Sequence, residues 1–273
     1  MWRRIEKARA GRGAVLAACI LAGVTEASSQ EALERVPAGR IAPAPAAARQ
    51  MFEVSAGADG TGPSWSIYSG LTAALFGDLR DNGVRLRLSG GYGRYRYTRP
   101  FFDEGRRRHL WPEFFGEQTS VDALIGYHWA WGPTTLKAYG GLTQERHRIS
   151  PGPDSPLDAD GDNAVQGTRS GIKLVVETWT RLADWGFFQA DANWSQPFEA
   201  YGGRIRLGHN LSGGWSVGLE AAAFGNLNHD GGRAGAFARF AWDKGEISLS
   251  AGLDGDLERI GGGYASIAAL TRF

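Results

Sequence analysis

The sequence predicts an all-β fold: an antiparallel up-and-down barrel of about 12 strands, or 10, of the kind that crosses a bacterial outer membrane. Apolar and polar residues alternate with period two through a dozen segments after residue 50. Most of these segments run roughly 9 to 14 residues, longer than the roughly 5 to 6 of soluble strands and long enough to cross a bilayer. Short and long connections also alternate, and aromatic residues cluster beside the short turns.

The start of the chain predicts export. A basic stretch, an apolar run and a small-residue site with Thr25 and Ala27 are typical of a signal peptide over 1–27, cleaved near Ala27. The LAAC at 16–19 also fits a lipoprotein box, and the Arg3-Arg4 pair fits twin-arginine export. An ordinary apolar region and an ordinary basic region explain both. Residues 28–50, rich in Ala and Pro, are expected to form a disordered linker before the barrel at 51–273.

The expected strands follow one another to the end of the chain. They cover 51–58, 64–76, 84–97, 118–131, 134–147, 165–180, 186–195, 201–211, 215–226, 234–242, 246–255 and 264–273. Tight connections are expected at 77–83, 132–133, 183–186, 212–214 and 243–245, and longer ones at 98–117, 150–163, 227–233 and 256–263. In a meander the two sets fall at opposite ends, which is the organisation of outer-membrane barrels.

The alternation sorts side chains onto two faces. The apolar face is expected to meet lipid, and the charged face a polar lumen in which acids and bases pair. The charged set consists of Arg85, Arg87, Asp122, Lys137, Arg169, Lys173, Glu177, Asp191, Arg204, Arg206, Glu220, Arg239, Glu246 and Asp254. In a barrel of about 12 strands such side chains obstruct much of the interior, which favours a narrow or plugged barrel. A soluble periplasmic β-sandwich would alternate as well.

Aromatic placement favours the barrel over the sandwich. Trp131, Trp215 and Trp242 each adjoin a tight turn, Trp179 and Trp185 flank another, and Phe273 ends the chain. Such a girdle is typical of side chains at the level of lipid headgroups.

Residues 84–97 read VRLRLSGGYGRYRY, and their pattern changes phase. Even positions from Val84 to Tyr92 are expected to face outward, whereas Tyr95 and Tyr97 are odd, so a β-bulge is expected near Gly93. The glycines of GGYG precede no helix pattern and therefore do not indicate a nucleotide loop.

Four stretches resemble the bacterial cellulose biosynthesis protein BcsS family of alphaproteobacteria. They are residues 65–97, 122–142, 206–220 and 235–242, and the similarity extends over nearly all of 64–273. The resemblance implies an exported protein, encoded with cellulose synthase components and resident in the outer membrane. It supplies no catalytic motif.

The largest outer loop offers a candidate site for glycan or lipopolysaccharide. It combines aromatic rings, which stack on sugars, with arginines, which bind phosphate or carboxylate: Phe101, Phe102, Arg106, Arg107, Arg108, Trp111, Phe114 and Phe115. A loop packed over the lumen or along the headgroups would use the same residues.

Other site types have weaker support. Asp158, Asp160 and Asp162 could present oxygens to calcium, but Gly161 does not stand where an EF-hand loop needs it, which favours a solvated turn. His209, Ser212 and Glu220 are the nearest to an acyl-hydrolase triad and are not expected to converge. Cys19 is the only cysteine, so neither a disulfide nor a thiolate metal site is predicted. No cofactor is predicted, and the formal net charge of +1 gives no reason to expect nucleic acid.

The sequence therefore predicts a non-enzymatic outer-membrane barrel, accessory to bacterial cellulose biosynthesis, export or surface retention. Its expected partners are outer-membrane lipid, cellulose and other cellulose-synthase components. The alternatives are a barrel enzyme that modifies lipid A or acyl chains, and the soluble β-sandwich module.

Overall fold

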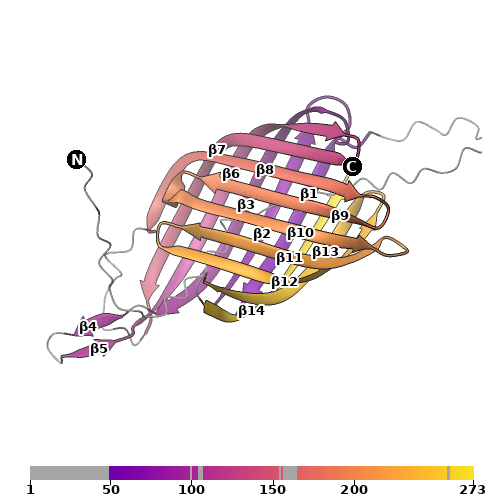
Figure 1. Ribbon diagram of the computed structural model, residues 1–273. Helices are drawn as coiled ribbons and strands as arrows, with labels where there is room; N and C mark the ends of the chain where they lie inside the picture. The colour runs from indigo at the N-terminus through magenta and orange to yellow at the C-terminus, as the bar shows by residue number, and fades with distance from the viewer. Residues whose placement is uncertain (1–48, 99, 104–106, 154, 156–164, 257–258) are drawn as a thin grey trace, which may run out of the picture.

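Twelve antiparallel strands close into a single barrel in the computed structural model (Figure 1). The structure describes residues 49–273 except 99, 104–106, 154, 156–164 and 257–258. Apart from the two strands of a small separate sheet, each strand pairs with its neighbours in the chain, and β1 pairs with β14. The predicted fold class is confirmed, and the soluble sandwich is wrong because the strands form one closed sheet. The predicted boundary at residue 27 lies outside the described residues.

The strand bounds follow the alternation closely. The barrel strands are β1 (Phe52–Thr61), β2 (Ser64–Ala74), β3 (Gly83–Thr98), β6 (Glu113–Trp131), β7 (Thr134–Pro151), β8 (Gly167–Leu182), β9 (Gly186–Ser195), β10 (Ala200–Asn210), β11 (Trp215–Asn226), β12 (His229–Trp242), β13 (Gly245–Asp256) and β14 (Arg259–Arg272). Strands β4 (Phe101–Asp103) and β5 (Arg108–Leu110) form a separate two-stranded sheet, and a 3-10 turn, η1 (Pro197–Glu199), precedes β10.

The first and last strands of the barrel pair with each other and close the sheet. Strands β1 and β14 pair from Glu53 opposite Arg272 to Thr61 opposite Tyr264. The carbonyl oxygen of Phe273 accepts hydrogen bonds from the backbone amides of Met51 at 2.7 Å and Phe52 at 3.2 Å. Closure leaves no open sheet edge, which is the condition for a sheet to sit in lipid.

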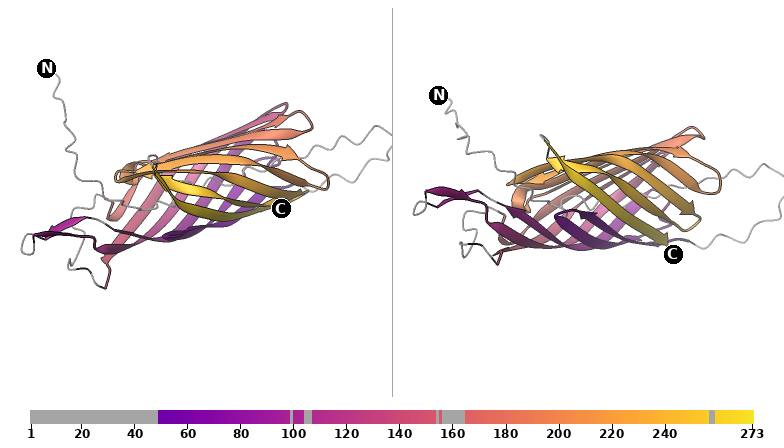
Figure 2. Two further views of the ribbon diagram at one scale, coloured as in Figure 1. Left: turned by 60° about the horizontal axis from the view of Figure 1, so that its bottom comes forward. Right: turned by 90° about the horizontal axis from the view of Figure 1, so that it is seen from below.

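The connections differ between the two ends of the barrel (Figures 1 and 2). The end that holds Phe273 and the turns at 132–133, 183–185, 211–214 and 243–244 is called the turn end. The opposite end, from which the β4–β5 hairpin projects, is called the loop end. The predicted alternation of connections holds in part. The long loops expected at 227–233 and 256–263 are wrong, because paired strand extends from Asn226 opposite His229 and from Asp256 opposite Arg259.

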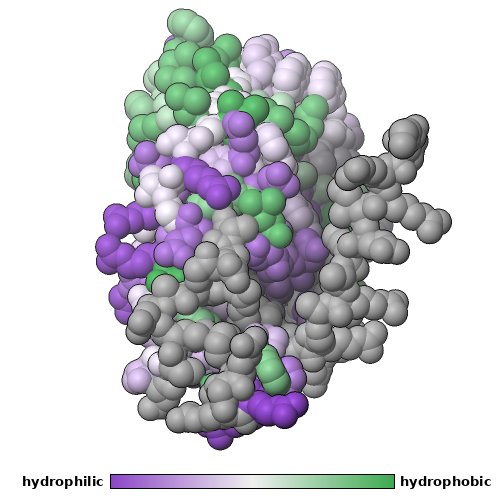
Figure 3. All heavy atoms as spheres, turned by 90° about the vertical axis from the view of Figure 1, so that its left-hand side faces the viewer, coloured by the Kyte–Doolittle hydropathy of each residue, from purple (hydrophilic) through white to green (hydrophobic). Residues whose placement is uncertain are grey.

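The outside of the barrel carries the apolar side chains. Exposed aliphatic residues on the strands include Val54, Ile67, Leu71, Leu86, Leu88, Val121, Ile125, Leu142, Ile172, Leu174, Val176, Ile205, Leu207, Val217, Leu219, Ile247, Leu249, Leu253 and Ile267. A soluble protein would bury such a set, whereas a membrane barrel presents it to lipid. Seen from the loop end, much of the coloured surface is hydrophilic and the apolar surface gathers along one side (Figure 3).

Aromatic side chains ring the turn end as the sequence predicts, with one exception. Trp131, Trp185, Trp215, Trp242 and Phe273 are exposed there. Trp179 is buried inside the barrel, where its ring centroid lies 6.1 Å from that of Phe187. It shares the inward phase of Glu177 on β8, and this phase takes it out of the predicted girdle.

The β-bulge predicted near Gly93 is wrong. Strand β3 keeps an unbroken register with both β2 and β6, so odd residues point inward along its whole length. Tyr95 and Tyr97 are buried inside the barrel, and Arg94 and Arg96 are exposed outside it. The apparent change of phase is a change of surroundings, because the outward face of β3 meets an apolar medium up to Leu88 and a polar one at Arg94.

Candidate functional site

The interior of the barrel gathers the charged residues that the alternation selected. With one exception, the fourteen predicted lumen residues are buried or half-buried. Arg169 is exposed at the loop end of β8, and its guanidinium lies 4.5 Å from the centroid of the Phe198 ring. Charged side chains removed from water need partners, and the strand pairing supplies them.

Two ion pairs lie on the β3 to β8 side of the interior. Arg87 donates to both carboxylate oxygens of Glu177, at 2.7 and 3.1 Å, and the exposed fractions of the two side chains are 3% and 1%. Lys173 donates to Asp122 at 2.7 Å. The first pair joins strands that are separated by β6 and β7 in the barrel wall, so it spans the interior as a chord.

A second network fills the opposite side. Arg206 donates to Glu220 at 2.7 Å and to the hydroxyls of Ser248 and Ser250 at 3.3 and 3.0 Å. The hydroxyl of Tyr264 donates to the other oxygen of Glu220 at 2.7 Å. These contacts link β10, β11, β13 and β14. Two further predicted members pair nearby: Arg204 with Asp191 at 3.0 Å, and Arg239 with Glu246 at 2.5 Å.

Sequence reasoning missed several interior charges. Arg233 bonds both Asp59, at 2.6 Å, and Asp254, at 2.7 Å, and Arg272 bonds Glu53 at 3.1 Å. All four missed residues, Glu53, Asp59, Arg233 and Arg272, lie in the inward phase of their strands. Extending that phase to the strand ends would have found them. Arg233 in particular fell inside the expected loop at 227–233.

The turn between β2 and β3 folds into the turn end of the barrel. Leu79 is buried, and its carbonyl oxygen accepts hydrogen bonds from His128 Nδ1 at 3.0 Å and Arg85 Nη2 at 3.1 Å. Arg85 also donates to the carbonyl oxygen of Asp78 at 2.9 Å. Arg85 therefore holds this inner turn in place through hydrogen bonds to its backbone carbonyls.

Aromatic side chains fill the loop end. Phe198 of η1 is buried at a φ of 53°, and its ring meets that of His147 edge-on with centroids 4.7 Å apart. Tyr97 stacks between Tyr95 and Phe114, at centroid distances of 6.1 and 5.4 Å. The described interior thus carries packed or ion-paired side chains at both ends and between them.

The β4–β5 hairpin places only some of the predicted glycan-contact residues on the surface. Phe102, Arg107, Arg108, Trp111 and Phe115 are exposed, and the Phe102 ring lies 5.1 Å from that of His109. Phe114 is 0% exposed and belongs to the inner stack, because it occupies the inward phase of β6. Phe101 lies in β4, and Arg106 lies outside the described residues.

The remaining candidates come together poorly or lie outside the described chain. The calcium candidates Asp158, Asp160 and Asp162 are outside the described residues. Elsewhere in the described chain, no three His, Cys, Asp or Glu side chains are grouped to hold a metal ion. His209 points outward beside Trp185, Ser212 lies in a turn, and Glu220 is engaged inside the barrel. These three do not meet. In the part that the structure describes, no helix has the length and apolar character to cross a membrane.

A family model described as cellulose biosynthesis protein BcsS matches residues 54–273, which is the whole barrel from β1 to the C-terminal Phe273. The chain belongs to this family. It is therefore an outer-membrane barrel related to cellulose biosynthesis, as the resemblance of its β2–β3 and β6–β7 stretches implied. No curated protein matches the BcsS-family chain in sequence.

Solved structures resemble the BcsS-family chain at low identity. The KdgM porin is 8% identical over 81% of this chain and 99% of its own, with a TM-score of 0.47. The translocator domain of autotransporter NalP from Neisseria meningitidis is 14% identical over 82% and 88%, at 0.48. The transport unit of the autotransporter AIDA-I from Escherichia coli is 11% identical over 90% and 93%, at 0.45. No substrate or activity passes from them to this chain.

Proposed function

We propose that this barrel is a non-enzymatic accessory of bacterial cellulose biosynthesis that retains glucan at the cell surface and does not conduct it. Two observations support this proposal. The Arg87–Glu177 ion pair crosses the interior from β3 to β8, and Arg206 on β10 reaches the hydroxyls of Ser248 and Ser250 on β13. A glucan chain passing through would have to separate the buried Arg87–Glu177 pair and displace the side chain of Arg206. Breaking one such pair costs about 3–5 kcal/mol, which disfavours passage of a polymer.

The outer surface supports residence in the outer membrane, with lipid as a partner. Short turns lie on the periplasmic side of such barrels and longer loops on the outside, which assigns the loop end to the cell surface. On β3, β6 and β7 the row of Leu88, Ala123 and Leu142 is apolar. Six residues further along each strand, Arg94 and Arg148 flank Glu117 in one outward-facing row. Six residues span about 20 Å along a strand, so we place these arginines at the depth of anionic headgroups.

The β4–β5 hairpin supplies the surface for glucan. It stands clear of the barrel beyond the loop end (Figure 2). Phe102 exposes its ring on β4, and Trp111 exposes its ring directly after β5. Sugar rings stack on such faces through their apolar C–H sides. Anchored by the barrel in lipid, the hairpin would hold cellulose close to the outer membrane.

Electrical measurement tests the non-conducting barrel. We expect the protein refolded into a planar bilayer to give no stepwise, ohmic conductance, because ion-paired side chains obstruct the interior. The combined variant Arg87→Ala and Arg206→Ala, which removes two side chains that reach across the interior, should leak more. Porin-like steps in the unsubstituted protein would overturn the proposal.

Substitution in the hairpin tests glucan contact. At about 1 kcal/mol for each aromatic contact, Phe102→Ala with Trp111→Ala should weaken binding of soluble cello-oligosaccharides roughly thirtyfold. Phe76→Ala is the matched control, since Phe76 is an exposed ring at the turn end. Isothermal titration of the detergent-solubilised barrel measures both. Equal affinity of the double variant and the unsubstituted protein would show that the hairpin does not bind glucan.

A deletion strain separates the proposal from the enzyme alternative. Loss of surface-retained cellulose with intact synthase activity is the expected phenotype. Unchanged cellulose together with altered lipid A would contradict an accessory role and support the enzyme.

A further inference from the structure

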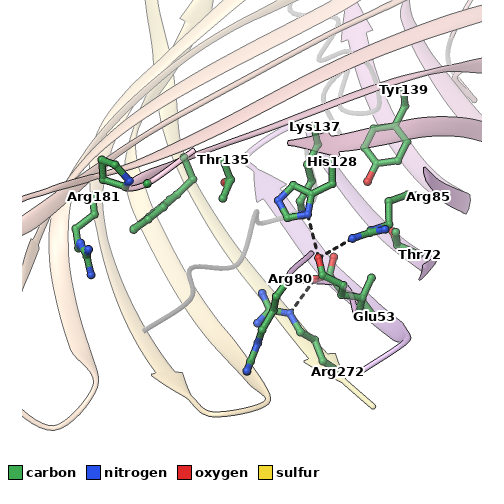
Figure 4. A pocket seen from close by; sticks show the side chains of 14 residues that line it. Glu53, Thr72, Arg80, Arg85, His128, Thr135, Lys137, Tyr139, Arg181 and Arg272 are labelled. Carbon is green, nitrogen blue, oxygen red and sulfur yellow. Dashed lines mark hydrogen bonds and ion pairs between the residues drawn. The ribbon is translucent and has the colours of Figure 1, made fainter. Parts of the chain in front are cut away.

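A basic pocket lies inside the turn end, between the inward-folded turn at 75–82 and the wall formed by β6, β7 and β8 (Figure 4). Its charged lining comprises five bases and one acid: Arg80, Arg85, Lys137, Arg181, Arg272 and Glu53. In Figure 4, Lys137, His128, Thr135 and Tyr139 lie across the pocket from Arg80, Glu53 and Arg272. The lining thus carries a large excess of positive charge.

The nearest acids are already engaged. Glu53 accepts from Arg272, and both oxygens of Glu177 accept from Arg87. Lys137 lies in register between His128 and Glu177, and its ammonium faces Glu53, the same carboxylate that accepts from Arg272 (Figure 4). One carboxylate thus serves more than one base of the lining, and the positive charge that is left over favours an anion in the pocket.

Two further bases add to the positive charge of the lining. The guanidinium of Arg85 donates to backbone carbonyls of the inner turn, which accept hydrogen bonds but carry no net charge. The side chain of Arg181 is half-buried and forms no ion pair with a described residue. Exposed Arg80, Gly132 and Pro133 lie at the opening of the pocket. An anion entering past them would meet Arg181 and Lys137.

Three buried polar atoms of the lining also have no partner in the described chain: His128 Nε2, Tyr139 Oη and Trp179 Nε1. Their residues are only 4%, 4% and 5% exposed. Buried polar atoms in proteins are almost always hydrogen-bonded. Tyr139 and Trp179 can each donate. His128 donates through Nδ1 to the Leu79 carbonyl oxygen, so the Nε2 of its neutral ring can only accept.

We propose that this pocket binds a phosphate group in its hydrogen phosphate form. Such a group offers negative charge to Lys137 and Arg181, oxygen acceptors to Tyr139 and Trp179, and a P–O–H donor to His128 Nε2. The cavity has a volume of about 50 Å³, room for a few water molecules or one small oxyanion. The remainder of a larger phosphate ester would extend through the opening.

Isothermal titration of the detergent-solubilised full chain with inorganic phosphate tests the site. We expect saturable binding that Lys137→Gln weakens about tenfold or more, as for loss of one charge-assisted contact, and that Arg181→Gln weakens less. Arg169→Gln is the matched control, since it removes an arginine from the other end of the same strand. Heat-modifiable migration on gels verifies that each variant is folded.

Matched anions sharpen the test. Sulfate has the shape and charge of phosphate but carries no proton at neutral pH, so we expect it to bind several-fold more weakly. Binding of glycerol phosphate would indicate that the ligand is a phosphate ester. Binding of inorganic phosphate without binding of glycerol phosphate would indicate that the ligand is the free ion. The proposal is overturned by any of three results: no saturable phosphate binding, equal binding by Lys137→Gln, or the same response to sodium chloride at equal ionic strength.

Discussion

A Glu177→Gln substitution is expected to destabilise the barrel by about 3–5 kcal/mol, because it leaves the Arg87 guanidinium charged and unpaired in the interior. The native carboxylate receives both arms of the guanidinium fork, and the amide can accept at only one atom. The centroid of the Tyr139 ring lies 3.9 Å from Cζ of the same guanidinium, but an uncharged ring cannot replace a carboxylate. Urea unfolding of the protein refolded into lipid vesicles measures the loss.

The matched control is Glu117→Gln, which removes a carboxylate from the pair with Arg94 on the outer face. That pair is as short, at 2.6 Å, but its side chains are 57% and 37% exposed. Water replaces the lost contact, so the expected cost is below about 1 kcal/mol. Replacing both interior partners, by Arg87→Met with Glu177→Leu, should cost less than Glu177→Gln alone. Equal losses at Glu177 and Glu117 would contradict the view that the interior is shielded from water.

These expectations rest on features that the sequence made accessible to different degrees. Alternation located every barrel strand, because the side-chain period of a strand is two whichever medium it faces. Alternation alone did not show whether the outward face of a strand meets lipid or a polar medium near the strand's end. At Arg94 to Tyr97 the inward side chains turn aromatic and the outward ones turn basic, and the change was mistaken for a bulge.

The partners of the interior charges were beyond sequence reasoning for a related reason. Adjacent-strand pairs such as Arg204 with Asp191 follow from register, but the chord from Arg87 to Glu177 depends on barrel closure and strand stagger. The inner turn at 75–82 was expected only as a tight connection. Its tertiary packing beneath Arg85 and His128 creates the basic pocket, and no local pattern in the sequence signals that packing.

A charge on the lipid-facing surface should be nearly as damaging as one left unpaired inside. Leu219 on β11 faces outward with 68% of its side chain exposed, four residues from the girdle residue Trp215. Leu219→Arg is expected to cost about 2–4 kcal/mol, the penalty for a guanidinium near the bilayer midplane. Leu227→Arg, in the adjoining turn at the loop end, is the depth control and should cost about 0–1 kcal/mol.

Both variants keep the interior intact, so the same urea titration in vesicles isolates the effect of the outer medium. The contrast also depends on that medium. In detergent micelles, where water and headgroups reach the surface more easily, the two arginine variants should differ less than in vesicles. Equal stability of the Leu219 and Leu227 variants in lipid would mean that β11 does not cross the bilayer at this depth. That result would contradict the interpretation of the outward-facing apolar residues as a membrane-spanning surface.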